Sequence, residues 1–581
     1  MSVEEGIRLN VDGNGADLVS VSGFSTSSST ASMDLSYSAA AATTAASSSS
    51  SFASASGGSD GKDNATSDGT IALLLENLVN NAQEVNVWLL TLILALGNAA
   101  DAIEINCIGF IMTEIPDMTT KDKEYLSAAV FLGMFFGGII CGFLSDSIGR
   151  KPCLLYSLGL NAIAGYASAL TPNIPLLIVC RVIGGVGIGG SVPAVFSLGA
   201  EMFPSLVRGK FLSVVASFWM VGAIFTATAA WIMLGSDLEG NKILPSTGWR
   251  SFAAVCATPA LVAFFLTYFF VSESPRFLLG KKQYTEAAAA LEFISGVPVR
   301  PIDLMQKTHQ SGGEHIDEDV AKGSLRQQQE NKSWLVRFEQ STFAKLFSPS
   351  MIRNTLVLSV IWFSLCFGSY GISTWISELF MDIGVTNAYA DAFIFALANL
   401  PGNIISICYV ESFGRRRLLS YGMGISALAA FGFAIDTKHK ETVVFFASLF
   451  NAFSTVGWNS LDCLSVESFP TNVRTTAMGV LAAAGRLGAI TAQFVNGSLE
   501  SNVPLLLGVT STCMVLGGLS SWLLENDNTG TQLSDEATSS SHRNRGASQS
   551  SKVGYTSISS RETSTHSPLG GGGGGGGDPN L

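Results

Sequence analysis

The central part of this sequence is a series of long apolar segments separated by short polar breaks. A helix needs about 20 apolar residues to cross the hydrocarbon core of a bilayer, and twelve segments are close to or above this length. They lie approximately at 86–111, 125–144, 153–170, 175–199, 211–234, 251–271, 354–378, 391–410, 418–435, 442–465, 477–497 and 503–524. A buried helical core of a soluble protein is the alternative, but such helices keep a polar outer face, which these segments lack. The pattern therefore predicts an all-α membrane protein with twelve transmembrane helices.

Composition and spacing divide the chain into five parts. Both tails are Ser-rich with Ala or Gly, and such segments cannot bury enough apolar surface to fold, so we expect them to be disordered. A transit peptide is the alternative for the N-terminal tail, but its acidity argues against that. Six apolar segments precede a charged link, whose Ala-rich stretch is expected to form short cytosolic helices, and six follow it. The tail, first half, link, second half and C-terminal tail cover 1–84, 85–272, 273–353, 354–525 and 526–581.

Charge and cysteine content exclude several classes of protein. Only 13% of the 581 residues are charged, compared with about 25% in soluble domains. The net charge of −12 leaves no basic surplus for binding nucleic acid. The cysteines lie in or beside apolar segments, so we expect free thiols and no disulfide framework. Because the sequence shows no phosphate-binding glycine loop, nucleophile–base set or metal-ligand cluster, we expect no enzymatic activity and no cofactor.

Lys and Arg are more frequent in the loops after even-numbered segments than in those after odd-numbered ones. Because cytosolic loops are enriched in these residues, both tails and the link are predicted to lie in the cytosol. We expect a monomer in the lipid bilayer. The sequence does not distinguish the plasma membrane from a vesicle membrane.

Two motifs occur twice at nearly the same separation. Residues 201–208 (EMFPSLVR) return at 467–474 (ESFPTNVR), and GRK at 149–151 returns as GRR at 414–416. Chance is a poor explanation for two shared offsets, so we interpret the chain as a duplicated six-helix unit. Charged side chains of these motifs lie at predicted helix ends, where ion pairs can form in one conformation and break in another. Simple anchoring of loops at the membrane surface is the alternative.

Several motifs resemble those of one protein superfamily. The segment GFLSDSIGRK at 142–151 resembles the loop signature of the major facilitator superfamily, and SESPR at 272–276 is similar to a motif of its sugar-porter-like branch. ADAIE at 100–104 and WNSLD at 458–462 resemble synaptic-vesicle-2-related proteins. The resemblance implies the major facilitator fold, in which two pseudo-symmetric six-helix halves alternate access to a site near the membrane midplane. Sugar porters carry Trp at the position of Asp462, which argues against hexose as the substrate.

The repeated motifs and the sugar-porter-like motif together define a predicted conformational latch. Its glycines permit a tight turn that a Cβ would disfavour, and its acidic and basic side chains are placed to bridge helix ends. The residues assigned to the latch are Asp146, Gly149, Arg150, Glu201, Arg208, Glu273, Arg276, Gly414, Arg415, Asp462, Glu467 and Arg474.

Ionisable residues deep in apolar segments are costly and usually functional, and this chain has few. Asp101 and Glu104 share one face of the first segment because they are three residues apart. At about 1.5 Å per residue, Asp101 and Arg181 of the fourth segment reach nearly the same depth, so we expect them to form an ion pair. The glycines at 184–190 would let the first and fourth helices approach closely. Proton-coupled members of the superfamily pair an acid and an arginine on these helices. This implies proton coupling by Asp101, Glu104 and Arg181, with a static ion pair as the alternative.

The second half offers candidates for substrate binding. Arg486 lies in the middle of the eleventh segment and needs an anionic partner there. Organic ion transporters similar to this chain carry Arg at the matching position when they bind anions, which implies an anionic substrate. Asp462 is the alternative partner, although its place near a helix end favours a latch role. In 399–403 (NLPGN), Pro and Gly break the helical hydrogen-bond pattern, so this segment is either a discontinuous helix lining a cavity or a simple kink. The candidates are Arg486, Tyr370, Asn399 and Asn403.

These features predict a secondary active transporter of a small organic solute, expected to be anionic and proton-driven. A facilitative sugar or polyol carrier is the alternative within transport. A non-transporting vesicle or receptor-like membrane protein is the alternative of another class, but such a protein need not retain buried charges.

Overall fold

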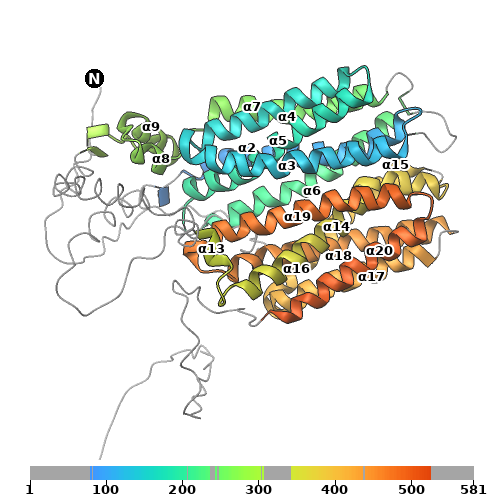
Figure 1. Cartoon of the computed structure of the whole chain (residues 1–581). Helices are drawn as coiled ribbons and strands as arrows, with labels where there is room; N and C mark the ends of the chain where they lie inside the picture. The colour runs from blue at the N-terminus through green and yellow to red at the C-terminus, as the bar shows by residue number, and fades with distance from the viewer. Residues whose placement is uncertain are drawn as a thin grey trace, which may run out of the picture. The chain divides into compact units, whose positions relative to one another are not determined.

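The computed structural model describes residues 79–524 except 81–82, 206, 236–242, 245–247, 303, 306–341, 386 and 436–438. All of these residues belong to one unit of the chain, which covers residues 1–536. Long helices that run side by side dominate it (Figure 1), and no strand occurs among the described residues. The predicted disorder of the tails concerns residues that lie almost entirely outside the described part.

The helices form two groups in chain order. The first half contains α2 (Glu84–Glu114), α3 (Thr120–Ile148), α4 (Arg150–Leu170), α5 (Ile174–Met202), α6 (Arg208–Leu234) and α7 (Trp249–Phe270). The second half contains α14 (Ile352–Asp382), α15 (Ala388–Leu397), α16 (Asn399–Phe413), α17 (Arg415–Ile435), α18 (Lys440–Glu467), α19 (Thr471–Leu499) and α20 (Val503–Ser520), with a 3-10 turn at Ser521–Leu523. The short helices α8 (Pro275–Gly280), α9 (Tyr284–Ser295) and α13 (Thr342–Leu346) lie between the halves in sequence.

Eleven helical spans among the described residues are long and apolar enough to cross a membrane, and α15 and α16 together form one of them. The predicted span at 442–465 corresponds to α18, which has 28 residues. Its most apolar stretch is less apolar than those of the eleven, because side chains such as Asn451 and Asn459 interrupt it. Helix α18 packs against α15, α16 and α17. It is therefore an integral part of the bundle and completes six spans in the second half.

Glycine turns join the second and third spans of each half. Helix α3 begins with a capping box, in which the Thr119 hydroxyl oxygen accepts the Asp122 backbone N–H and the Asp122 carboxylate accepts that of Thr119. It ends at Gly149, whose φ of 110° is strained for any residue with a Cβ. Gly414 precedes α17 in the same way, with a φ of 83°. The duplicated motif thus produces the same turn twice.

The glycines of α5 make a contact different from the predicted one. A Cβ on Gly185 would collide with the backbone of Val130 in α3, and a Cβ on Gly189 would collide with the backbone of Met134. Gly187 similarly faces α4. The prediction that these glycines bring the first and fourth spans together is therefore wrong. They let α5 pack closely against α3 and α4.

The eighth span is interrupted at Ala398, between α15 and α16. Pro401 has no N–H to donate to the carbonyl of Leu397, four residues earlier. Ala398 nevertheless keeps helical dihedral angles, with φ −62° and ψ −13°. The side-chain amide of Asn399 donates to the Ala396 carbonyl at 2.8 Å and replaces part of the lost backbone bonding. The eighth span is thus built from two helices that meet at Ala398, and Asn399 and Asn403 of the second helix line a cavity, as the discontinuous-helix alternative predicts.

The two halves contact each other at the end of the bundle where α3 begins and α14 finishes, which we term the closed end. The ammonium group of Lys123 forms ion pairs with Glu378 of α14 and, at 2.5 Å, with Glu500 after α19. The Tyr389 hydroxyl of α15 donates to the Glu114 carboxylate of α2 at 2.5 Å. Because α3 runs from Lys123 to the Gly149 turn, the latch motifs lie at the opposite end.

Candidate functional site

A cavity of about 350 Å³ lies between the two halves. Helices α2 and α6 of the first half and α14, α15, α16, α18 and α19 of the second contribute most of its lining. The four predicted substrate-binding residues, Tyr370, Asn399, Asn403 and Arg486, all line it. Its amide side chains are Asn98, Asn106, Asn399, Asn403, Asn451 and Asn459, and its charged side chains are Asp462 and Arg486.

Arg486 has an aromatic neighbour but no acidic one. Its guanidinium carbon lies 5.7 Å from the centre of the Tyr370 ring, in the range of a cation–π contact. No carboxylate oxygen of the described residues lies within 4.0 Å of its nitrogens. The alternative in which Asp462 neutralises Arg486 is therefore not realised in this conformation.

The structure also corrects the assignment of Asp462 to the latch. Asp462 lines the cavity together with Arg486 and takes no part in the ion pairs formed at helix ends by described residues. Its position near the end of α18 suggested otherwise, because distance along a helix does not reveal the direction of the side chain.

Two tryptophans missed as site residues shape one wall of the cavity. The rings of Trp362 and Trp458 meet edge to face with centroids 5.6 Å apart. The indole N–H of Trp458 donates to Ser369 at 3.0 Å, and that of Trp362 donates to Ser465 at 2.9 Å. These bonds fix both rings, as expected for buried indoles. The feature of the sequence that could have identified these two site residues is the presence of a tryptophan within an apolar span.

Helix α2 presents different residues to the cavity and to its own half. Asn98 and Asn106 line the cavity, and sequence reasoning missed them although their spacing of eight residues places them on one helix face. Asp101 and Glu104 point instead towards α4 and α5, where they meet Asn161 and Arg181. One helix therefore connects the cavity with the buried charges.

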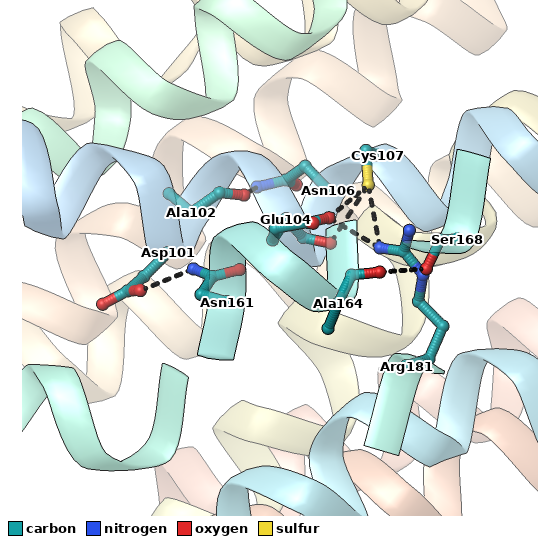
Figure 2. A network of polar contacts seen from close by, with 9 residues as sticks. All are labelled: Asp101, Ala102, Glu104, Asn106, Cys107, Asn161, Ala164, Ser168 and Arg181. Atoms are coloured by element: carbon teal, nitrogen blue, oxygen red, sulfur yellow. Dashed lines mark hydrogen bonds and ion pairs between the residues drawn. The ribbon is translucent and has the colours of Figure 1, made fainter. Parts of the chain in front are cut away.

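The buried charges are arranged differently from the prediction (Figure 2). Arg181 forms an ion pair with Glu104, with Nη1 and Oε2 2.6 Å apart, and both side chains are buried. The carboxylate of Asp101 instead accepts a hydrogen bond from the Asn161 amide at 3.1 Å. It also accepts one from the Ser191 hydroxyl, which the figure does not include. The predicted Asp101–Arg181 pair is therefore wrong, although α2 and α5 are in contact as expected.

The error has a simple geometric cause. Glu104 lies about 4.5 Å further along α2 than Asp101, which is less than the length of an arginine side chain. A depth estimate from residue counts cannot separate two acids that are less than one turn apart. Asn161 of α4 and Ser191 of α5 donate hydrogen bonds to the Asp101 carboxylate in place of Arg181. These donors belong to other helices, so the spacing along α2 gives no sign of them.

A thiol completes the environment of Glu104. Cys107 donates to the Glu104 carboxylate at 3.0 Å, and Arg181 lies 3.5 Å from the Cys107 sulfur. All three side chains are buried. The acid thus has one charged partner and one weak neutral donor, as expected for a buried carboxylate.

The repeated motifs form the same ion pair in each half. Arg150 at the start of α4 lies 3.4 Å from Glu201 at the end of α5, and Arg415 at the start of α17 lies 3.1 Å from Glu467 at the end of α18. Each pair ties the third span of its half to the fourth. The repeated sequence motifs therefore form the same contact in both halves.

The remaining latch candidates lie around these pairs. Arg208 and Arg474 are buried, and the Arg474 Nε donates to the Phe469 carbonyl at 3.2 Å. Arg276 lines a small hollow with Glu201 and Arg208. The side chain of Asp146 lies outside the described part of the chain.

Comparison with known proteins identifies the family. The family described as Sugar (and other) transporter matches residues 36–523. The chain belongs to this family. Its relatives include synaptic vesicle glycoprotein 2B of Rattus norvegicus, 26% identical with 74% of this chain and 82% of that protein covered. Synaptic vesicle glycoprotein 2C of Homo sapiens is 25% identical, with 74% and 77% covered. These matches confirm the predicted resemblance to the sugar-porter-like branch and to synaptic-vesicle-2-related proteins.

Solved structures confirm the fold of this family member. The chain is similar to the inward-open xylose transporter XylE from E. coli, with a TM-score of 0.59, 19% identity and coverage of 77% of this chain and 98% of that one. A D-xylose-proton symporter gives the same TM-score and identity, with coverage of 77% and 100%. The likeness establishes the predicted major facilitator fold of twelve helices in two halves. The chain is thus a multi-pass membrane protein of a transporter family.

The sugar-porter-like motif of this family member supports the first helix-end pair. Glu273 accepts the backbone N–H groups of Arg150 and Lys151, both at 3.1 Å, at the start of α4. The Arg150 guanidinium also lies 5.2 Å from the centre of the Phe277 ring. Burial raises the pKa of the Glu273 carboxyl above its usual value, while the amide hydrogen bonds act in the opposite direction. The motif therefore holds Arg150 close to Glu201.

Proposed function

We propose that this protein is a secondary active transporter that moves a small organic anion by alternating access and couples this movement to protons. The proposal depends chiefly on Arg486, a cation in the cavity wall with no carboxylate of a described residue within 4.0 Å. A cation at the membrane midplane is costly unless it is neutralised. An anionic solute in the cavity would supply the missing partner.

Asp101 supports the proton-coupling part of the proposal. Its carboxylate is buried and bonded to the neutral side chains of Asn161 and Ser191, whereas Glu104 has Arg181 as its partner. A buried charge without an opposite charge is costly, and a bound proton removes that cost. We therefore take Asp101 as the proton carrier and the Glu104–Arg181 pair as the contact that rearranges during transport.

Uptake into proteoliposomes tests the anion. Carboxylates, phosphate and sugars are compared for the purified wild type, Arg486→Ala and Arg417→Ala, which removes an exposed charge of α17 as a matched control. We expect Arg486→Ala to lower anion uptake by about tenfold or more, and Arg417→Ala to leave it unchanged. Normal anion uptake by Arg486→Ala would remove the basis of the proposal.

The proton is tested separately with Asp101→Asn. This variant should lose uptake driven by a pH gradient but keep solute exchange, because exchange needs no net proton movement. Asp391→Asn in α15, which removes an acid outside the cavity lining, is the control. Gradient-driven uptake that survives in Asp101→Asn would exclude Asp101 as the carrier.

A facilitative sugar or polyol carrier is the second candidate. The six asparagines and the tryptophan pair of the cavity wall favour it, because amide and aromatic groups suit hydroxyl-rich solutes. Sugar exchange that is insensitive to both Arg486→Ala and a pH gradient would support this function. A protein that moves none of the solutes would support the non-transporting alternative.

Topology is part of the proposal. The Lys and Arg distribution supports a cytosolic position for both tails and for the link between α7 and α14. Epitope tags at either end should become accessible to antibody only after cells are permeabilised. Antibody labelling of a tag on intact cells would indicate the opposite orientation.

A further inference from the structure

The cavity contains two opposite charges that do not neutralise each other. Arg486 belongs to α19 and Asp462 to α18, and both line the same space. Their charged atoms lie more than 4.0 Å apart. Within the described part of the chain, neither side chain forms an ion pair, and the side chain that Arg486 contacts, Tyr370, is neutral. Two such charges inside a membrane protein are costly unless something placed between them satisfies both.

The surroundings indicate how a ligand would be oriented. Both charges line the same cavity as Tyr370 and Cys366 of α14, and the Arg486 guanidinium lies 5.7 Å from the centre of the Tyr370 ring. Trp458 lies one helical turn before Asp462 on α18, and its ring is 5.8 Å from that of Tyr370. Aromatic faces beside a carboxylate are a favourable setting for an ammonium group. The Arg486 end of the site suits a carboxylate, to which guanidinium binds in a forked geometry.

We propose that the solute is a zwitterion of the amino-acid or betaine class, with its carboxylate at Arg486 and its cationic nitrogen between Asp462 and the ring of Trp458. This inference rests on the proposed function, because it keeps Arg486 as the anchor for an acidic group, and it specifies the substrate class. A cavity of about 350 Å³ is of the size used for small-molecule sites.

A simple anion would satisfy only half of this site. It would neutralise Arg486 but leave Asp462 without a countercharge beside a second negative group, which like-charge repulsion and desolvation make unfavourable. A dicarboxylate would be rejected more strongly for the same reason. The two charges of the cavity therefore favour a carboxylate that also carries an amine over one that does not.

The test compares solutes that differ at one end only. Ligand-induced thermal stabilisation of the full-length purified protein, and competition among solutes, are measured for matched series built on propionate, butyrate and valerate. Each series contains the carboxylate, its ω-amino acid and the corresponding dicarboxylate, and glycine betaine is added as a quaternary amine. We expect at least one ω-amino acid to bind about tenfold more tightly than the carboxylate of its own series, or the betaine to bind about tenfold more tightly than propionate.

Asp462→Asn is the decisive variant because the two side chains have the same shape. We expect it to lose one binding preference and to gain affinity for another class of solute. It should abolish the preference for zwitterions and, by removing the repelling charge, increase the affinity for dicarboxylates. A misfolded protein cannot produce that gain. Asp391→Asn, on α15 and outside the cavity lining, should leave all affinities unchanged.

The outcomes separate the two proposals. Carboxylates that bind through Arg486 as tightly as their amino acids, with no effect of Asp462→Asn, would overturn the zwitterion and leave the anion carrier standing. Binding of none of these carboxyl compounds would overturn both. A preference for zwitterions that survives Asp462→Asn would also refute the role of Asp462.

Discussion

Arg181 of α5 binds Glu104 at 2.6 Å, although Asp101 lies only three residues away on the same helix. This choice gives the two acids of α2 different tasks. In this conformation Glu104 is paired with an opposite charge, whereas Asp101 is held by Asn161 and Ser191, which carry no charge. The acid without a countercharge is the one that can gain most from a proton.

The first prediction concerns the stability of this pair. Glu104→Gln leaves the Arg181 guanidinium buried without its countercharge and should destabilise the protein by about 3–5 kcal/mol. Thermal unfolding in detergent measures the effect. Asp101→Asn should reduce the stability much less, because the partners of residue 101 are neutral and no buried charge loses its countercharge. Equal unfolding temperatures for both variants would contradict the arrangement in which only Glu104 is paired.

The second prediction concerns the packing of α5 on α3. Gly185→Ala places a methyl group against the backbone of Val130, which cannot move as a side chain could, and should cost about 1–3 kcal/mol. Gly508→Ala in α20 is the control, because its Cβ would meet no atom within 4 Å. If both variants melt at the wild-type temperature, the close contact between α3 and α5 is not present in the membrane protein.

The third prediction concerns the closed end. Lys123→Gln removes the ion pairs to Glu378 and Glu500 that join the halves, so the starts of α3 and α15 should exchange backbone hydrogens faster. Hydrogen exchange read by mass spectrometry measures this opening. Lys121→Gln is the matched control, since Lys121 is largely exposed and pairs with Glu124 of its own helix. Identical exchange in the two variants would show that Lys123 does not hold the halves together.

The fourth prediction concerns pH. Because burial raises the pKa of Glu273 in the folded protein, the folded state holds this proton more tightly than the unfolded chain does. The contribution of Glu273 to the free energy of unfolding should therefore fall as pH rises from about 4.3, the usual value, through the raised pKa. Glu273→Gln should make the unfolding temperature less dependent on pH in this window. A profile parallel to that of the wild type would contradict the shift.

The ion pairs Arg150–Glu201 and Arg415–Glu467 illustrate what could be anticipated. The repeat placed one basic and one acidic residue at corresponding helix ends of each half. Because the unit is duplicated, an ion pair formed in one half was expected in the other half as well. Which acid each arginine binds was not evident, because the motifs that supply the two partners are about 50 residues apart in the chain and meet only after α4 and α5, or α17 and α18, have packed.

The sequence by itself determined the twelve apolar spans, the two halves and the short list of ionisable residues inside them. These features depend on local composition and on the fixed rise of a helix, which are properties of the chain alone. The tertiary structure decided which groups meet. Arg181 pairs with Glu104 instead of Asp101, and the glycines of α5 pack on α3 and α4 instead of α2. Asp462 lines the cavity instead of joining the latch. Each of these outcomes depends on how one helix is rotated against its neighbours and on which donors the neighbours bring, and no spacing within a single helix contains that information.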